Sequence, residues 1–167
     1  MKDPNIAKTT LLAILLIFTF NLLKAQETNF SGSWSVNIEK SYTIGISMSS
    51  VVEVQIKQSP ATFDITRISK DNKVQAPAYT EVLSFDGTFS KPVAIGQNQN
   101  KKSTIRWSPD HKVLIEQSKY VDDQGNQVQK NTSTITLTNA GKTLQVKSII
   151  EDDNGVYKMI QVFDRKD

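Results

Sequence analysis

Cysteine is missing from this chain of 167 residues, and His111 is its only histidine. Without cysteine the protein has no disulfide and no thiolate, and a single histidine leaves the usual nitrogen and sulfur ligands of zinc incomplete. Acid–base catalysis most often uses histidine, but His111 lies in a polar turn, so we predict a surface role for it. We therefore expect no metal, no cofactor and no catalytic activity, and a fold that its hydrophobic core must hold alone.

Long apolar runs are also scarce, and the main one lies near the N-terminus. Two lysines precede an apolar block at residues 11–23, and Ala25 follows it, an order typical of a secretory signal peptide cut after Ala25. The block is shorter than the roughly 20 residues that a membrane-spanning helix needs. We expect residues 1–25 to be a signal peptide and residues 26–167 to form one domain, periplasmic or secreted, without stable membrane insertion.

Charge of one sign is not concentrated in any stretch of the sequence. The chain has 20 basic and 17 acidic residues, and removing residues 1–25, with three lysines and one aspartate, leaves 17 and 16 (20 − 3 and 17 − 1). The two signs alternate along the remaining chain, so no run of lysine and arginine marks a nucleic-acid or acidic-membrane surface. The sequence predicts no nucleic-acid partner, an ordinary solvated surface and a monomer.

What the chain does contain is a succession of short segments with alternating polarity. In residues 30–38, Phe30, Trp34 and Val36 face one way while serines face the other, the period-2 pattern of a half-buried strand. Residues 103–114 and 133–144 are two similar strand–turn–strand units, which favours a meander of hairpins. We count about nine strands and no helix, and predict an all-β fold, an antiparallel up-and-down β-barrel of eight to nine strands.

The first strand carries Gly32-Ser33-Trp34, which resembles the Gly-x-Trp motif of lipocalins and fatty-acid-binding proteins. The chain is most similar to small exported bacterial lipocalin-like domains. This resemblance implies a barrel in which Gly32 and Trp34 close one end beneath an arginine; Arg165 is the first candidate and Arg106 the second. In the last strand Gln161 and Phe163 stand where many fatty-acid-binding proteins have Arg-x-Tyr, so a carboxylate clamp is not expected.

Inward-facing side chains of the predicted barrel suggest a function. Apolar and aromatic residues there would bind a small apolar or amphipathic ligand, and the expected walls are Phe63, Tyr79, Leu83, Phe85, Trp107 and Met159. The alternative is that these side chains fill the barrel, which would then act as a protein-interaction or cell-envelope module. Glu81 shares the inward face of Tyr79 and Leu83 and is the one acidic residue singled out there.

Overall fold

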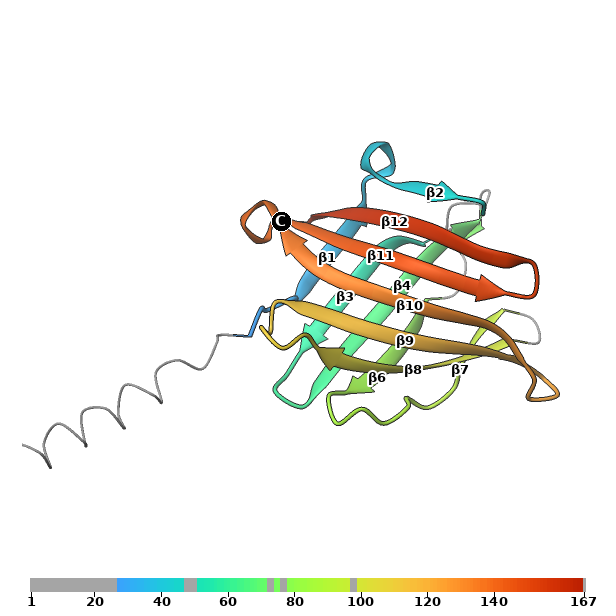
Figure 1. The fold of residues 1–167 in the computed structure, drawn as a ribbon. Helices are drawn as coiled ribbons and strands as arrows, with labels where there is room; N and C mark the ends of the chain where they lie inside the picture. The colour runs from blue at the N-terminus through green and yellow to red at the C-terminus, as the bar shows by residue number, and fades with distance from the viewer. Residues whose placement is uncertain (1–26, 47–50, 72–73, 76–77, 97–98, 167) are drawn as a thin grey trace, which may run out of the picture.

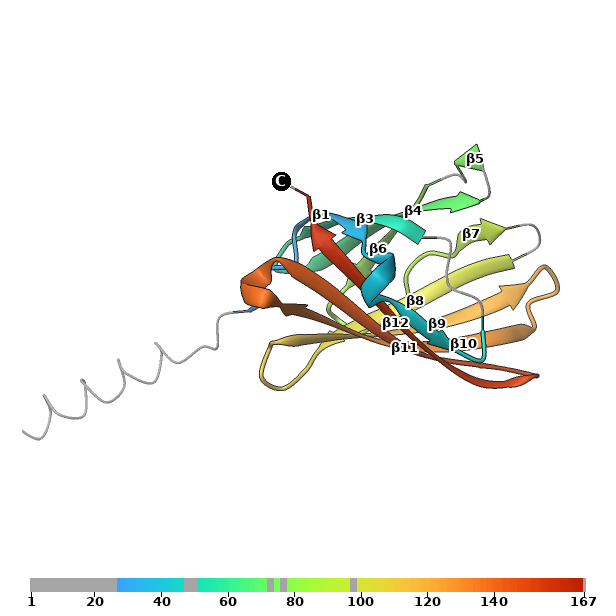
Figure 2. The same ribbon diagram turned by 90° about the horizontal axis from the view of Figure 1, so that it is seen from above.

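The computed structural model describes residues 27–46, 51–71, 74–75, 78–96 and 99–166. These residues form an antiparallel sheet that curls into a nearly closed barrel (Figures 1 and 2). The predicted signal peptide lies outside the described residues. Within the described part of the chain, no helix is both long and apolar enough to cross a membrane.

The described residues form twelve strands and two short 3₁₀ turns. The strands are β1 (Gly32–Val36), β2 (Tyr42–Ile44), β3 (Val51–Gln58), β4 (Thr62–Asp71), β5 (Val74–Gln75), β6 (Tyr79–Ser84), β7 (Val93–Gly96), β8 (Gln99–Trp107), β9 (Val113–Asp122), β10 (Gln127–Thr138), β11 (Thr143–Asp152) and β12 (Gly155–Arg165). The 3₁₀ turns are η1 (Ile38–Lys40) and η2 (Asn139–Gly141).

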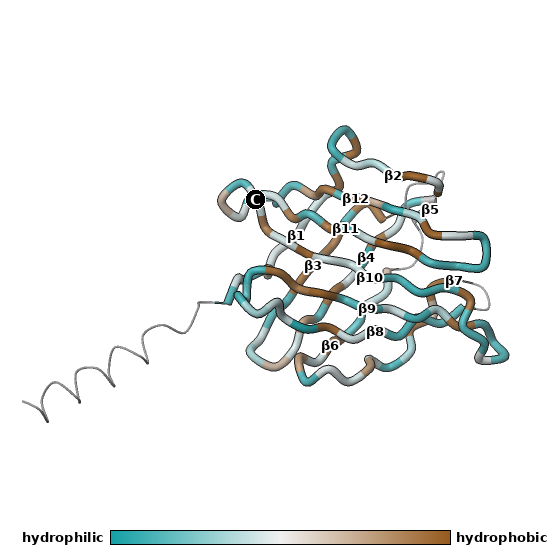
Figure 3. Tube along the Cα trace, in the orientation of Figure 1, coloured by the Kyte–Doolittle hydropathy of each residue, from teal (hydrophilic) through white to brown (hydrophobic). Residues whose placement is uncertain are grey.

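Most strands pair with their neighbours in sequence. The order across the sheet is β5-β4-β3-β1-β12-β11-β10-β9-β8-β7, with β6 on β4 and β2 on β12. The predicted all-β antiparallel barrel is confirmed, and the architecture is compatible with a calycin-like fold. The two hairpins predicted from the sequence recurrence are β8–β9 and β10–β11. Hydropathy varies along the strands, and the hairpin turns between β9 and β10 and between β11 and β12 are mainly hydrophilic (Figure 3).

The strand count was underestimated at eight to nine. The additional strands are short: β2 has three residues, β5 two and β7 four. Segments of this length contain at most two side chains on each face, so alternating polarity does not distinguish them from loops. β2 continues the edge of β12 beyond the point where β1 leaves it.

Aromatic residues fill one end of the barrel. Trp34, Phe30 and Phe63 are completely buried, and the Trp34 indole N–H donates to the Phe30 carbonyl at 3.2 Å. The Arg165 guanidinium carbon lies 4.7 Å from the Trp34 ring centroid, the cation–π contact that the family resemblance implied. Arg165 also donates to the Ser31 carbonyl at 2.8 Å, so it joins the end of β12 to the start of β1.

Gly32 allows the guanidinium to approach. Its φ is +148°, and a Cβ at this position would lie 3.3 Å from Arg165 Nη2 and 3.6 Å from Trp34 Nε1. Any side chain would press against both members of the cation–π pair. The Gly-x-Trp motif therefore has a structural reason at this end of the barrel.

Replacing Arg165 with alanine should lower the free energy of unfolding by about 1 kcal/mol, because a partly exposed cation–π contact is lost. Urea denaturation monitored by tryptophan fluorescence measures this change. The matched control is Arg106→Ala, which removes an exposed arginine from β8. An equal loss of stability in both variants would contradict a special role for the Arg165–Trp34 contact.

Candidate functional site

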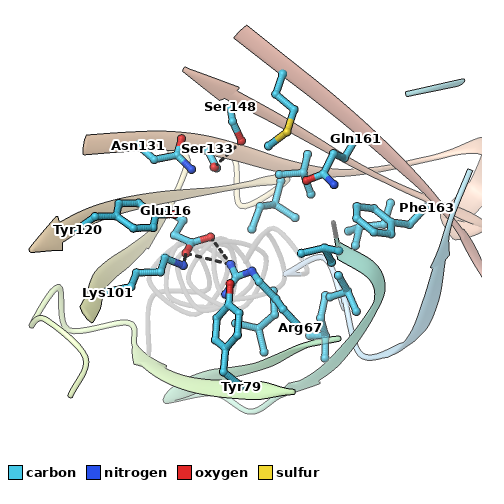
Figure 4. A pocket seen from close by; sticks show the side chains of 18 residues that line it. Arg67, Tyr79, Lys101, Glu116, Tyr120, Asn131, Ser133, Ser148, Gln161 and Phe163 are labelled. Carbon is cyan, nitrogen blue, oxygen red and sulfur yellow. Dashed lines mark hydrogen bonds and ion pairs between the residues drawn. The ribbon is translucent and has the colours of Figure 1, made fainter. Parts of the chain in front are cut away.

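A cavity of about 100 Å³ lies inside the barrel and borders the packed core (Figure 4). One wall is apolar and is shared with the core, from Val54, Ile56, Ile65, Ile135, Leu144 and Phe163. The other wall is polar and includes Arg67, Tyr79, Lys101, Glu116, Tyr120, Asn131, Ser133, Ser148 and Gln161. The cavity is therefore amphipathic, with its two kinds of surface facing one another.

The polar wall arises because the inward positions of several strands change from apolar to polar along their length. On β4 the inward series is Phe63, Ile65 and then Arg67, and on β9 it is Leu114 followed by Glu116. Successive strands are in register, so these polar positions meet at one level of the barrel. The sheet thereby gathers side chains that lie up to 49 residues apart in sequence.

Four charged side chains on four strands form a closed cluster at this level. Glu81 Oε2 accepts from Arg67 Nη1 and from Lys101 Nζ, both at 2.5 Å. Glu116 accepts from the same two cations, with Arg67 Nη2 at 2.8 Å and Lys101 Nζ at 2.7 Å. Ser103 Oγ donates to the remaining Glu81 oxygen at 2.8 Å. Two cations and two carboxylates thus neutralise one another.

Burial and pairing act in opposite directions on these groups. Burial disfavours the Glu116 carboxylate, but Arg67 and Lys101 outweigh it and lower the pKa of Glu116 to about 2. Burial and neighbouring Arg67 would lower the pKa of Lys101, yet Glu116 and Glu81 raise it above its ordinary value. Near neutral pH both groups are therefore charged.

The cluster also bridges the seam of the barrel. Among the described strands, β6 pairs with β4, and no ladder joins it to β7 or β8. Glu81 of β6 reaches across by its side chain to Lys101 and Ser103 of β8. These side-chain contacts link β6 to β8 beside a backbone hydrogen bond from Ser90, in the segment after β6, to the Ser103 carbonyl at 2.8 Å.

Two buried amides on the polar wall present an atom without a hydrogen-bond partner in the described structure. These atoms are Asn131 Oδ1 and Gln161 Nε2, and the Gln161 residue is only 6% exposed. Between them the Ser133 and Ser148 hydroxyls bond to each other at 2.8 Å (Figure 4). A buried amide atom without a partner costs free energy. The two amides therefore identify the part of the cavity that a polar group from a ligand would complete.

The sequence-predicted pocket residues separate into two groups. Tyr79 and Met159 line the cavity. Phe63 and Leu83 are fully buried in the core, with Phe85 and Trp107 packed against it. The Phe85 and Trp107 rings are stacked at 5.5 Å, and Phe30 contacts both Phe63 and Trp107. These four side chains lie in the aromatic end of the barrel and are not part of the cavity lining.

Sequence reasoning found one member of the ion cluster and missed three. Glu81 does face inward, at 1% exposure. Arg67, Lys101 and Glu116 were missed. The alternation continues through Arg67. The sequence did contain a signal for them. Each of the three lies at an inward position of its strand, where an apolar residue would be expected.

His111 lies outside the site. The His111 ring lies 5.8 Å from Trp107, and its Nδ1 is 3.4 Å from Glu27. The described residues contain no group of three histidine or acidic side chains placed to hold a metal ion.

Comparisons with known proteins do not add a family. No protein-family model matches the chain, and no curated protein matches it. The structure supports the coarser statement that the chain is an antiparallel, nearly closed β-barrel compatible with a calycin-like fold.

Replacing Glu116 with glutamine should destabilise the fold by about 3–5 kcal/mol, because Arg67 and Lys101 would each lose a buried anionic partner. In the wild type, the lowered pKa of Glu116 means that its contribution is complete above about pH 4.5 and disappears as the pH falls toward 2. Urea denaturation from pH 7 to pH 2 measures both effects, and the variant should lose part of the acid dependence.

Glu53→Gln provides the matched control. Glu53 pairs with Lys166 at 2.8 Å near the surface, where such a contact contributes at most about 1 kcal/mol. If Glu116→Gln changed stability as little as Glu53→Gln, the interior cluster would not hold the seam closed.

Proposed function

We propose that the protein is a non-catalytic exported carrier that binds a small amphipathic molecule inside the barrel. The observation that supports this function is the cavity itself, where apolar side chains face a polar wall with two incompletely bonded amides, Asn131 and Gln161. An apolar group would lie against the core side and a polar group against the amides. This division of surface is what an amphipathic ligand requires.

The volume restricts the size of the ligand. About 100 Å³ is smaller than the roughly 150 Å³ cavity that holds benzene in an engineered protein, and below the roughly 300 Å³ where drug-sized pockets begin. A long-chain lipid does not fit without opening the barrel. The proposed ligand is a short-chain molecule.

The electrostatics restrict its charge. The cluster of Arg67, Lys101, Glu81 and Glu116 is neutral as a whole, and each carboxylate already has cationic partners. An ionised ligand would be buried without a counter-ion, at a high desolvation cost. An uncharged hydroxyl or amide group avoids that cost. Such a group both donates and accepts, so it can bond either to the Gln161 Nε2 donor or to the Asn131 Oδ1 acceptor.

The filled barrel without a ligand remains the alternative, and the small volume supports it. In that case the amides would bond to trapped water, and the protein would act through its surface as an interaction or envelope module.

Native mass spectrometry of the protein purified from its host without denaturation tests the proposal directly. A reproducible small adduct that organic solvent releases would support a carrier. In a second arm, ¹⁵N-labelled protein is titrated with butanol, isobutyramide and butyrate. We expect the Gln161 side-chain amide to shift saturably with the alcohol and the amide and to respond less to the anion.

The Gln161→Leu variant separates binding from folding. It removes an unpaired buried amide, so stability should be unchanged or higher, while affinity for the amide probe should fall about 3- to 10-fold with the lost hydrogen bond. Gln117→Leu, an exposed change on β9, is the control. No adduct and no shift of the Gln161 amide would contradict the carrier and favour the filled barrel.

A further inference from the structure

The outer face of strands β8 to β12 carries an excess of positive charge that the linear sequence conceals. These strands lie side by side across one broad front of the barrel (Figure 1). Because alternate residues point outward, the charged side chains on this front can be assigned from the buried positions between them. The outward basic residues are Lys102, Arg106, Lys119, Lys130, Lys147 and Lys158, against the acidic Glu151 and Asp164.

Three of these lysines form a continuous row across the sheet. Lys102 on β8 is directly opposite Lys119 on β9, which is directly opposite Lys130 on β10. Like charges at directly opposed positions repel and destabilise a sheet. Lys130 has a partial partner in Glu151 at 3.6 Å, whereas the Lys102 and Lys119 ammonium groups both lie 5.4 Å from the Phe89 ring. An anionic partner would relieve this repulsion.

Exposed apolar side chains lie on the same face. Of the large hydrophobic residues that are exposed in the described chain, most lie on these strands, beside the row or at the edge that β2 adds to β12: Ile149 on β11, Val156 on β12, Phe89 beside Lys102 and Lys119, Tyr42 and Ile44 on β2, and Ile46 just after it. The register places Ile44 opposite Lys158, and Lys158 opposite Ile149, so apolar and basic side chains alternate across three strands. A groove of about 340 Å³ lined by these residues and by Tyr42 and Ile160 deepens the apolar part.

We propose that this face, the basic front of β8 to β12 with the adjoining β2, docks the protein onto an anionic membrane surface. Lysines attract acidic headgroups, and apolar side chains among them enter the interface between headgroups and acyl chains. A nucleic acid backbone offers no apolar surface for the exposed isoleucine and valine side chains, whereas a lipid surface does. The combination of lysines with these side chains therefore favours a lipid surface. The groove would receive the upper part of an acyl chain between Lys147 and Lys158.

This inference is independent of the interior cavity. The residues of the basic front point away from the barrel interior, and their substitution leaves the ion cluster and the Gln161 and Asn131 amides unchanged. Docking would hold the barrel against a membrane without inserting any segment across it.

Co-sedimentation with vesicles tests the proposal, using the protein as its host processes it. Phosphatidylcholine vesicles with 30% phosphatidylglycerol are compared with phosphatidylcholine alone, at 50 and 500 mM NaCl. We expect binding to the anionic vesicles that weakens at least tenfold at high salt. Equal binding to both kinds of vesicle, or none to either, would overturn the proposal, as would tighter binding to duplex DNA than to the anionic vesicles.

Two variants identify the face. The triple change Lys102→Gln, Lys119→Gln and Lys130→Gln should weaken partitioning by roughly fivefold per lysine, about a hundredfold in total. Its control is Lys57→Gln, Lys70→Gln and Lys166→Gln, three exposed lysines that lie on β3, on β4 and beside Glu53 of β3, which removes the same charge and should change partitioning less than threefold. Ile44→Ser with Ile149→Ser should weaken it about tenfold. Equal losses in the two lysine variants would show that net charge alone, and not this face, accounts for binding.

Discussion

The neutral cluster of Arg67, Lys101, Glu81 and Glu116 is the interaction on which the interior of the barrel depends. Each group alone would be costly to bury, and only the complete set compensates the desolvation of its members. The four side chains come from β4, β6, β8 and β9, so the cluster can form only when these strands have curled round to face one another. In doing so it joins β6 to β8, where the described backbone has no ladder.

The cluster also determines what the cavity can accept. It occupies one side of the barrel interior, while the aromatic end around Trp34 fills another, and about 100 Å³ is left between them. The charges are already paired there, so the hydrogen bonds that a ligand could complete are those of the Asn131 and Gln161 amides. The small size, the neutral charge and the amphipathic character of the proposed ligand thus all follow from this one arrangement of side chains.

The two faces of the sheet treat charge differently. Inside, opposite charges are matched within hydrogen-bonding distance. Outside, the register brings Lys102, Lys119 and Lys130 into one row. There the excess positive charge is stabilised by water and by the Phe89 ring, which lies near the Lys102 and Lys119 ammonium groups. The three lysines are 17 and 11 residues apart in sequence, with acidic residues between them. The distribution of charged residues along the sequence therefore predicts an ordinary mixed surface, whereas in the folded sheet the basic residues lie on one face.

The all-β barrel and the meander of hairpins could be predicted from the sequence, because they follow from local alternation and turn residues, whereas the Arg165–Trp34 contact was expected only from a family resemblance. The sequence also predicted that Glu81 faces the interior, because the alternation within a single strand is enough to assign a side chain to one face of the sheet. Three features could be seen only in the folded barrel. Arg67, Lys101 and Glu116 complete an ion cluster with Glu81, and Phe63 and Trp107 belong to the core and not to the cavity lining. Lysines that are scattered in the sequence lie together on the outer face of β8 to β12. These features depend on the register between strands distant in sequence, which alternation within a single strand does not specify.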